Sequence, residues 1–193
     1  MTPVDDGSRQ RPLRLFVASE LPADALARIA AWQERELAPR GALRVNRSLH
    51  LTLCFLGSVP AERRAEVENV LAGVPVEPAT VAVGDAIFLP EHGRKRIVAL
   101  PLTAAAGAPG GLQRLHDLQA RIAAALIGSD LCEAESRPWL PHLTVARFRR
   151  PGHPFDLQNV NFGELLLSRV VLYTSVLDRS GAIHTPLRTY TAR

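Results

Sequence analysis

The sequence predicts an α+β protein built from two pseudo-symmetric lobes of antiparallel sheet, with outer helices around a central cleft. Three observations support this fold class. Short apolar runs of strand length alternate with two long stretches in which apolar residues recur at helical spacing. Each of these helical stretches precedes a predicted strand that carries the same four-residue pattern. The length of 193 residues fits one domain, or two small lobes that share a core.

The first half contains two predicted strands and two predicted helices. They are a strand at residues 13–18, a helix from Leu21-Pro22 to about residue 38, a strand at 49–56 and a short helix at 61–71. Proline is tolerated in the first turn of a helix, which favours a start at Leu21-Pro22. Pro39 and Gly41 end the first helix, and Gly57 is expected to end the second strand.

The second half has the same kinds of element, with more strands. We expect strands at 80–88 and 96–102 joined by a turn at 90–93, a helix at 112–127, and strands at 140–148, 165–177 and 183–190. The helix has the clearest pattern, because five apolar residues share one of its faces. These residues are Leu112, Leu115, Leu118, Ile122 and Leu126.

The remaining sequence features limit the class of protein. Residues 1–12 are polar and are predicted to form a flexible tail ahead of a single domain at 13–193. No apolar run approaches the roughly 20 residues of a spanning helix, so we expect no membrane partner. Cys54 and Cys132 lie far apart and form no CxxC pattern, which argues against a disulfide framework or a zinc site. We therefore expect a reducing compartment, the cytoplasm.

The charge is basic and comes almost entirely from arginine. Lys and Arg total 23 against 19 Asp and Glu, a net charge of +4, and all but Lys95 of the 23 are Arg. Guanidinium groups bind phosphate through two parallel hydrogen bonds, so such a surface suits phosphate ligands. A general compositional bias toward Ala, Arg, Leu and Pro explains the same count. The charge is therefore compatible with nucleic acid without establishing it.

One short pattern occurs twice. His50-Leu51-Thr52-Leu53 and His142-Leu143-Thr144-Val145 both follow the form His-apolar-Thr-apolar, and the second histidine comes 92 residues after the first. Side chains alternate between the two faces of a strand, so His and Thr share one face and the apolar residues share the other. A single copy would be a weak signal, since a lone strand histidine is usually a surface or core residue. Two copies in matching contexts are much more specific.

Two imidazoles and two hydroxyls around one anion suit in-line displacement at phosphorus. One neutral histidine takes a proton from the attacking group, and the other, protonated, gives one to the leaving oxygen. The threonine hydroxyls donate to the non-bridging oxygens. We expect no metal and no cofactor, because neither motif contains a carboxylate or the HxH or HExxH spacing of a metal site. A Walker loop and a GxSxG motif are also absent, which argues against an ATP-dependent ligase and a serine hydrolase.

These residues resemble the two-histidine phosphoesterase superfamily, and within it the 2'-5' RNA ligase and RNA 2',3'-cyclic phosphodiesterase branch. The resemblance runs from residue 13 to about 190 and rests on five segments. They are Arg14–Ala18 with Leu21-Pro22, Asn46–Gly57, Pro138–Arg147, Leu172–Leu177 and the end around Pro186-Leu187.

The resemblance implies hydrolysis of a terminal 2',3'-cyclic phosphate of RNA to a 2'-phosphomonoester, together with joining of RNA ends through a 2'-5' linkage. It implies that His50 and His142 are the catalytic pair and that Thr52, Thr144 and Arg147 bind the phosphate. For hydrolysis we assign His142 as the base that activates water and His50 as the acid. RNA with a cyclic phosphate is the implied partner, and a monomer is the expected state.

Two details of this site depart from simple expectation. Strict alternation places Arg147 on the face opposite His142, unless a bulge returns it to the cleft. The residue at position 184 is His, where an aromatic residue is common in the family that the sequence resembles. Base stacking then falls to other rings, although Phe16 and Phe148 are also suited to core packing. The candidates are Phe16, Trp139 and Phe148.

Two other functions remain open. The same chemistry could act on a small cyclic nucleotide, a 2'-5' oligoadenylate or an ADP-ribose cyclic phosphate. Alternatively, the arginine content fits an RNA-binding module that performs no turnover, with RNA affinity that depends on salt.

Overall fold

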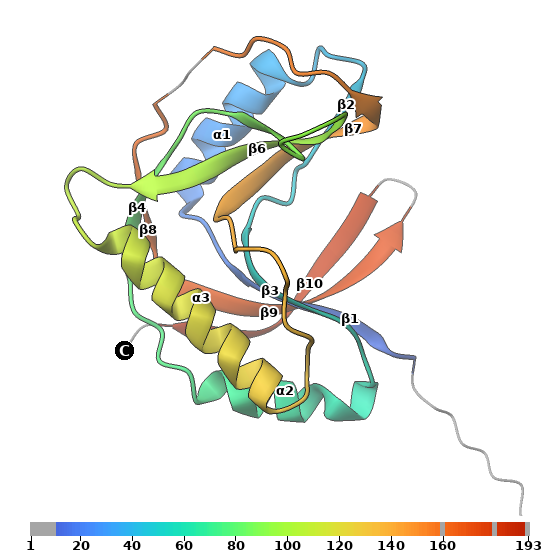
Figure 1. Ribbon diagram of the computed structural model, residues 1–193, viewed down its shortest axis with the longest axis vertical. Coiled ribbons are helices and arrows are strands. Elements are labelled where there is room, and N and C mark those ends of the chain that lie inside the picture. Colours follow the sequence, from blue (N-terminus) through green and yellow to red (C-terminus); the bar gives the residue numbers. More distant parts are fainter. Residues whose placement is uncertain (1–10, 159–160, 179–180, 192–193) are drawn as a thin grey trace, which may run out of the picture.

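The computed structural model describes residues 11–158, 161–178 and 181–191. Its elements (Figure 1) are β1 (Leu13–Ser19), α1 (Ala23–Glu36), β2 (Leu43–Val45), β3 (Leu51–Val59), the 3-10 helix η1 (Ala61–Arg63), α2 (Arg64–Ala72), β4 (Ala79–Val83), β5 (Ile87–Leu89), β6 (Lys95–Ala104), α3 (Gly111–Gly128), β7 (His142–Gly152), β8 (Glu164–Leu167), β9 (Arg169–Asp178) and β10 (Gly181–Thr191). The predicted tail at 1–12 lies outside the described residues except for Arg11 and Pro12.

The strands pair in the order β10-β9-β1-β3-β7-β6-β4-β8, with β2 on β7 and β5 on β6, and every ladder among the described residues is antiparallel. We call β1, β3, β9 and β10 the first lobe, and the other six strands the second lobe. The lobes meet where β3 pairs with β7, and this ladder has a single residue pair, Leu51 with Leu143. The predicted α+β class with two antiparallel lobes is therefore confirmed.

The lobes do not coincide with the two halves of the sequence. The predicted strand at 165–177 is two strands, because the chain crosses from one lobe to the other at Ser168. β8 pairs with β4 in the second lobe, whereas β9 pairs with β1 in the first. The spacing of apolar residues does not reveal this change of neighbouring strand, because both segments have the pattern of apolar strands.

Other boundaries also differ from expectation. The predicted strand at 80–88 is interrupted at residues 84–86 and forms β4 and β5. β3 continues past Gly57 to Val59, because the glycine takes a φ of +73° within the strand instead of ending it. The three-residue strand β2 was not predicted, since a segment this short has no readable period.

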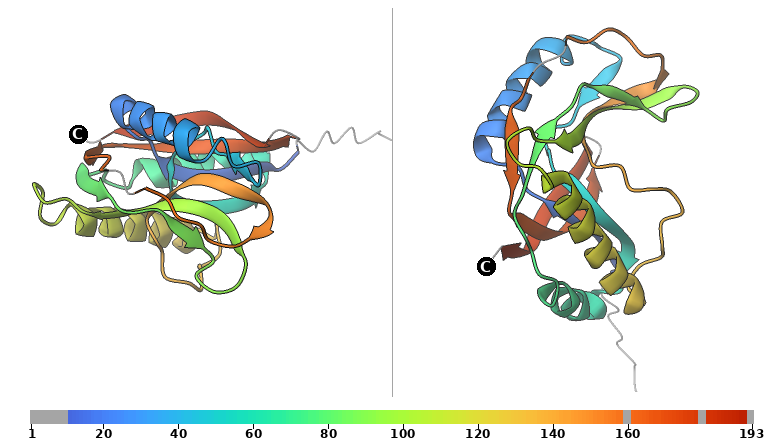
Figure 2. Two further views of the ribbon diagram at one scale, coloured as in Figure 1. Left: turned by 90° about the horizontal axis from the view of Figure 1, so that it is seen from above. Right: turned by 60° about the vertical axis from the view of Figure 1, so that its left-hand side comes forward.

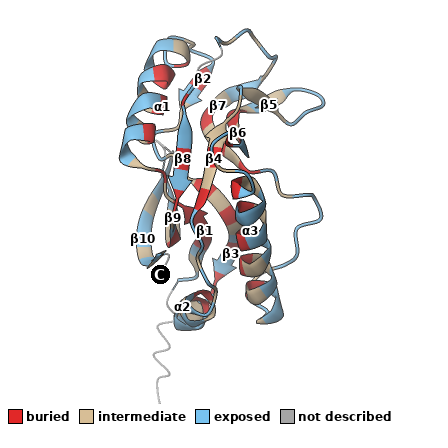
Figure 3. Ribbon diagram, turned by 90° about the vertical axis from the view of Figure 1, so that its left-hand side faces the viewer, coloured by how far each residue is buried: buried red, intermediate tan, exposed pale blue. Residues whose placement is uncertain are grey.

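Each helix has buried residues along one side (Figure 3), and α2 packs against both α3 and β10. Figures 1 and 2 show α1 and α2 at opposite ends of the molecule. In α3 the predicted stripe is buried at Leu115, Leu118, Ile122 and Leu126. One cluster of buried apolar side chains includes members of both lobes, such as Leu53 and Val145. Among the described residues, no helix is both long and apolar enough to cross a membrane.

Candidate active site

The two histidine motifs face each other where the lobes meet. His142 is the first residue of β7, and His50 lies directly before β3 instead of inside the strand as predicted. Leu51 and Leu143 form the pair that joins the lobes, and both are fully buried. Because the strands are antiparallel, this register places His50 opposite Thr144, and Thr52 opposite His142. The structure thus brings the four predicted motif residues together, and all four are half-buried.

Both imidazoles are oriented in the same way. His50 Nδ1 lies 2.9 Å from the Ser48 carbonyl oxygen, and His142 Nδ1 lies 2.8 Å from that of Leu140. A carbonyl oxygen only accepts hydrogen bonds, so Nδ1 carries the hydrogen in each ring. The Nε2 atom is then the one that takes up or releases a proton.

Each motif strand carries a β-bulge at the fourth motif residue. In the β6–β7 ladder Val98 pairs with Ala146 and Ala99 with Thr144, so Val145 is the extra residue. A bulge reverses the alternation of the residues that follow it. Arg147 therefore lies on the same face as His142 and Thr144, and its side chain is exposed. It is paired across the sheet with Arg44, and burial together with Arg44 lowers the pKa of its guanidinium.

The equivalent bulge in β3 changes the face of the strand on which Phe55 lies. In the β1–β3 ladder Val17 pairs with Cys54 and Ala18 with Thr52, so Leu53 is the extra residue. Alternation alone places Phe55 in the core with Leu53, but its side chain is 59% exposed. Strict alternation does not reveal this exposed ring beside Phe16, because one inserted residue is invisible to a period of two.

His50 lies against a cluster of rings on the first lobe. Its ring centroid is 5.1 Å from Phe16 and 5.0 Å from His184. Phe16 is only 2% exposed, because it stacks on Tyr173 at 5.2 Å and also contacts Phe55 at 5.9 Å. A base that approaches this cluster would meet Phe55 before Phe16.

The three predicted stacking residues occupy different surroundings. Trp139 donates its indole N–H to the Thr52 carbonyl oxygen at 3.1 Å, and its ring contacts His116. Phe148 belongs to another aromatic group, with Phe88 and Phe155. Of the three, only Phe16 is in ring contact with a motif histidine.

The surroundings of His50 disfavour its charged form. Burial is the largest cause, followed by the positive field of His184, and together they lower its pKa to about 4. Arg147 and His142 add smaller effects in the same direction, whereas the bond to Ser48 opposes them. The charges of Arg147 and His142 therefore lie close enough to His50 to act on its ring.

His184 is a third histidine in the site. It lies on β10, and its Nδ1 is 3.1 Å from the Ser48 hydroxyl, so Ser48 contacts both imidazoles. Burial lowers the pKa of His184 as well. The signal in the sequence was the histidine at a position where the resembled family has an aromatic residue, but its contact with His50 depends on strand pairings that the sequence does not reveal.

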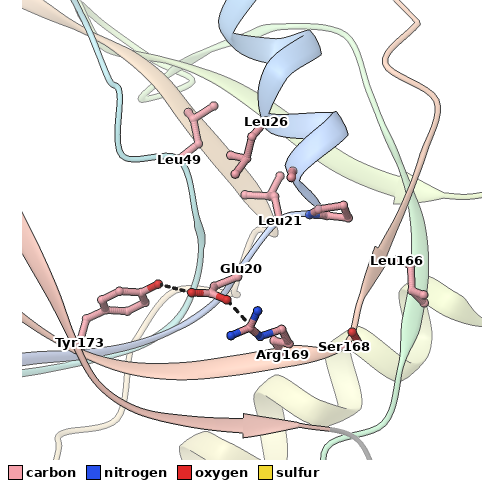
Figure 4. A pocket seen from close by; sticks show the side chains of 10 residues that line it. Glu20, Leu21, Leu26, Leu49, Leu166, Ser168, Arg169 and Tyr173 are labelled. Carbon is pink, nitrogen blue, oxygen red and sulfur yellow. Dashed lines mark hydrogen bonds and ion pairs between the residues drawn. The ribbon is translucent and has the colours of Figure 1, made fainter.

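A cavity of about 590 Å³ adjoins this ring cluster through Leu49 and Tyr173 (Figure 4). Glu20 lines this cavity. Its carboxylate accepts a hydrogen bond from the Tyr173 hydroxyl at 3.1 Å and forms an ion pair with Arg169 at 3.2 Å. Burial and Glu20 raise the pKa of Tyr173 to about 12, so its hydroxyl stays a donor. The volume lies within the range of small-ligand pockets.

Fold and site together define a two-lobed protein with one histidine motif from each lobe at a shared centre. A family model described as the 2'-5' RNA ligase superfamily matches residues 21–160. A protein of Escherichia coli K12 named RNA 2',3'-cyclic phosphodiesterase is 32% identical over 179 residues, which cover 92% of this chain and 95% of that protein. A protein of the same name from Methanocaldococcus jannaschii is 26% identical over 183 residues, 91% of this chain and 99% of its own. The chain belongs to the 2'-5' RNA ligase superfamily.

Solved structures agree with this assignment. The apo crystal structure of E. coli LigT matches with a TM-score of 0.75 and 26% identity over 95% of this chain and 99% of LigT. The protein TT0787 of Thermus thermophilus matches equally well, with a TM-score of 0.75 and 26% identity over 94% of this chain and 98% of its own. LigT complexed with 3'-AMP matches with a TM-score of 0.71, 26% identity and coverage of 94% and 98%. Within the described part of the chain, no group of three or more His, Cys, Asp or Glu residues could hold a metal ion.

Proposed function

We propose that the protein hydrolyses a terminal 2',3'-cyclic phosphate of RNA to a 2'-phosphomonoester. The observation that carries this proposal is the paired arrangement of His50, Thr52, His142 and Thr144 around one centre. It is supported by the relatives that bear the name of this activity. The family name also supports a second direction, in which a hydroxyl of another RNA end replaces water and a 2'-5' linkage forms.

The phosphate is held between the two motif strands. The hydroxyls of Thr52 and Thr144 donate to its non-bridging oxygens, and Arg147 adds a cation on the same face. His142 Nε2 takes a proton from water as the water oxygen attacks phosphorus. The bond from phosphorus to the ribose 3'-oxygen breaks, and His50 Nε2 gives a proton to that oxygen. The product carries a 2'-phosphate and a free 3'-hydroxyl.

This assignment requires His50 to be protonated when substrate is bound. In the free protein its pKa is about 4, so it is neutral at pH 7. An anion beside an imidazole favours the cationic form and raises the pKa. The cyclic phosphate therefore recruits the proton that His50 later donates, and binding of the anion strengthens as pH falls.

The decisive test uses a short RNA that ends in a 2',3'-cyclic phosphate, in EDTA. The expected product is a 2'-phosphate, identified by phosphorus NMR and by sensitivity to alkaline phosphatase. His50→Ala and His142→Ala should each lower turnover by about 10²- to 10⁴-fold, the usual size of one acid or base contribution. Full activity in either variant would refute the proposal.

Other substrates are separated by comparison at equal concentration. A kcat/KM much larger for a cyclic mononucleotide, a 2'-5' oligoadenylate or an ADP-ribose cyclic phosphate would move the function to that substrate. Salt-sensitive RNA binding with no product from any of them would identify a binding module.

The cellular setting follows from the same proposal. RNA is the expected partner, and the two free thiols, Cys54 and Cys132, fit a reducing compartment such as the cytoplasm. We expect a monomer, because the two lobes pack on each other through one shared apolar core. Sedimentation of the purified protein tests the last point.

A further inference from the structure

The bulges in the motif strands leave two carbonyl groups to be satisfied. A bulged residue does not take part in the regular strand ladder. Leu53 and Val145 are these residues, and both are buried. A buried carbonyl without a partner is costly, so donors come from outside the two bulged ladders. The Val145 carbonyl accepts one of them from the backbone N–H of Asn46 at 2.9 Å.

A glutamine side chain supplies a donor to each bulge. Gln119 Nε2 of α3 donates to the Leu53 carbonyl at 3.2 Å, and Gln33 Nε2 of α1 donates to that of Val145 at 2.7 Å. Each glutamine lies on the helix of one half of the sequence and holds the motif of the other half. Gln33 is only 1% exposed and also donates to the Asn46 carbonyl at 2.9 Å.

The backbone carbonyls of the two motif threonines also accept hydrogen bonds from side chains outside their own strands. Asn46 Nδ2 donates to the Thr144 carbonyl at 2.7 Å, and Trp139 Nε1 donates to the Thr52 carbonyl at 3.1 Å. Asn46 comes shortly before His50 in the sequence, and Trp139 shortly before His142. The segment that leads into each motif therefore binds the opposite motif.

These bonds replace a strand ladder at the place where the ladder stops. Within the described residues β3 and β7 pair at Leu51 with Leu143 alone, so little direct pairing joins the two motif strands. Asn46 and Trp139 link the segment ahead of each motif to the opposite strand. Gln33 and Gln119 tie β7 to α1 and β3 to α3. The four donors act on the third and fourth residue of each motif, next to the histidine and threonine side chains.

We propose that Gln33, Asn46, Gln119 and Trp139 are positioning residues that set the separation of the two motifs. The inference rests on the proposed function, because the separation matters only if one phosphate bridges both histidines. None of the four needs to touch substrate. Loss of a donor lets one motif strand shift against the other, and small displacements of catalytic groups reduce rate steeply.

The test replaces each glutamine by a side chain of similar shape without a donor. Gln33→Met and Gln119→Met are compared with Gln113→Met, because Gln113 is exposed on α3 and donates to Asp117 in the same helix. Trp139→Phe provides a further variant that keeps an aromatic ring but removes the indole N–H together with part of the ring system. All are made in the full chain and checked for native circular dichroism and Tm.

We expect kcat on the cyclic-phosphate RNA to fall about 10-fold or more in Gln33→Met, Gln119→Met and Trp139→Phe, with a much smaller change in KM. Gln113→Met should match the wild type. A merely structural role would lower Tm and leave kcat of the folded protein unchanged. Wild-type kcat in Gln33→Met and Gln119→Met would overturn the inference.

A second readout does not depend on turnover. Inorganic phosphate is titrated while the ring signals of His50 and His142 are followed by NMR. In the wild type both rings should respond with one apparent Kd, because one anion contacts both. In the glutamine variants the two responses should separate or weaken, and identical titrations in all proteins would contradict the positioning role. Absence of turnover in the wild type, with a shared phosphate response, would refute the RNA substrate and leave the positioning inference standing.

Discussion

The two motif strands have the same backbone and different surroundings. In both, the histidine Nδ1 bonds a carbonyl two residues earlier, and the fourth motif residue forms a bulge. Five residues after the histidine, however, β3 presents the exposed ring of Phe55, whereas β7 presents the cation of Arg147. A repeated scaffold thus fixes where side chains point. Under the proposed function, the residues placed on it divide the work between a nucleobase and a phosphate.

The two motif histidines also differ in their surroundings. His50 is enclosed by Phe16, His184 and Tyr173, which lower its exposure to water and, through burial, its pKa to about 4. The ring contacts among the described residues include His50 but do not extend to His142. An imidazole that is hard to protonate until an anion arrives is suited to deliver its proton only to bound substrate.

The largest expected effect separates the acid from the base. A nucleoside 2'-nitrophenyl phosphodiester has a leaving group that departs without a proton. His50→Gln should therefore turn over this diester at nearly the wild-type rate while losing about 10²- to 10⁴-fold on the cyclic phosphate. His142→Gln should be slow on both substrates. Recovery in His142→Gln instead of His50→Gln, measured by nitrophenolate release, would reverse the assignment.

The next largest effect tests whether Arg147 binds the phosphate while Phe55 binds the base. Arg147→Met should reduce kcat/KM for every cyclic phosphate by about 10- to 100-fold, since a charge-assisted bond to phosphate is lost. The slope of affinity against salt concentration should also become smaller. A decrease confined to particular bases would show that Arg147 contacts the base.

Phe55→Ala should have a smaller and more selective effect. Base–aromatic stacking contributes about 1–3 kcal/mol, so KM should rise while kcat changes little. Purine substrates, which stack most strongly, should lose more than pyrimidines. Steady-state kinetics on cyclic mononucleotides that differ only in the base make the comparison, with Phe148→Ala as the control on a separate aromatic group. Equal losses for the two variants would argue against stacking on Phe55.

Hydrophobic period and the repeated motif predict much of this molecule. The helix predicted at 112–127 is observed at Gly111–Gly128, because its apolar stripe is buried against strands and against α2. The shared face of His and Thr follows from the geometry of any strand. These features depend on residues that are close in sequence, which is why they can be predicted without the fold.

Features that depend on one inserted residue or on distant partners could not be predicted. The bulges at Leu53 and Val145 decide where Phe55 and Arg147 point, and neither bulge leaves a mark in the sequence period. Cys54 and Cys132, with sulfur atoms 3.8 Å apart, meet only because β3 and the segment after α3 adjoin. His184 meets His50 because β10, β9, β1 and β3 follow one another across the sheet.

The smallest expected effect isolates the field of His184 on His50. His184→Phe keeps a ring against Phe16 and removes a group whose positive charge lowers the pKa of His50. Burial, the largest cause, remains, so the pKa should rise but stay below the ordinary value of 6.5. NMR titration of the His50 ring between pH 3 and 8 measures the change, and an unchanged pKa would show that His184 exerts no field there.

His184→Phe should also change kcat/KM, and the direction of the change depends on the role of His50. A higher pKa means that more His50 is protonated at neutral pH. If His50 is the acid, kcat/KM at pH 7 should increase modestly in His184→Phe, because a larger fraction of the free protein holds the proton to be donated. If His50 is the base, kcat/KM at low pH should decrease instead, since protonation removes the acceptor. The direction of this small change therefore decides whether the enclosure of His50 by rings serves to hold a proton back until the phosphate binds.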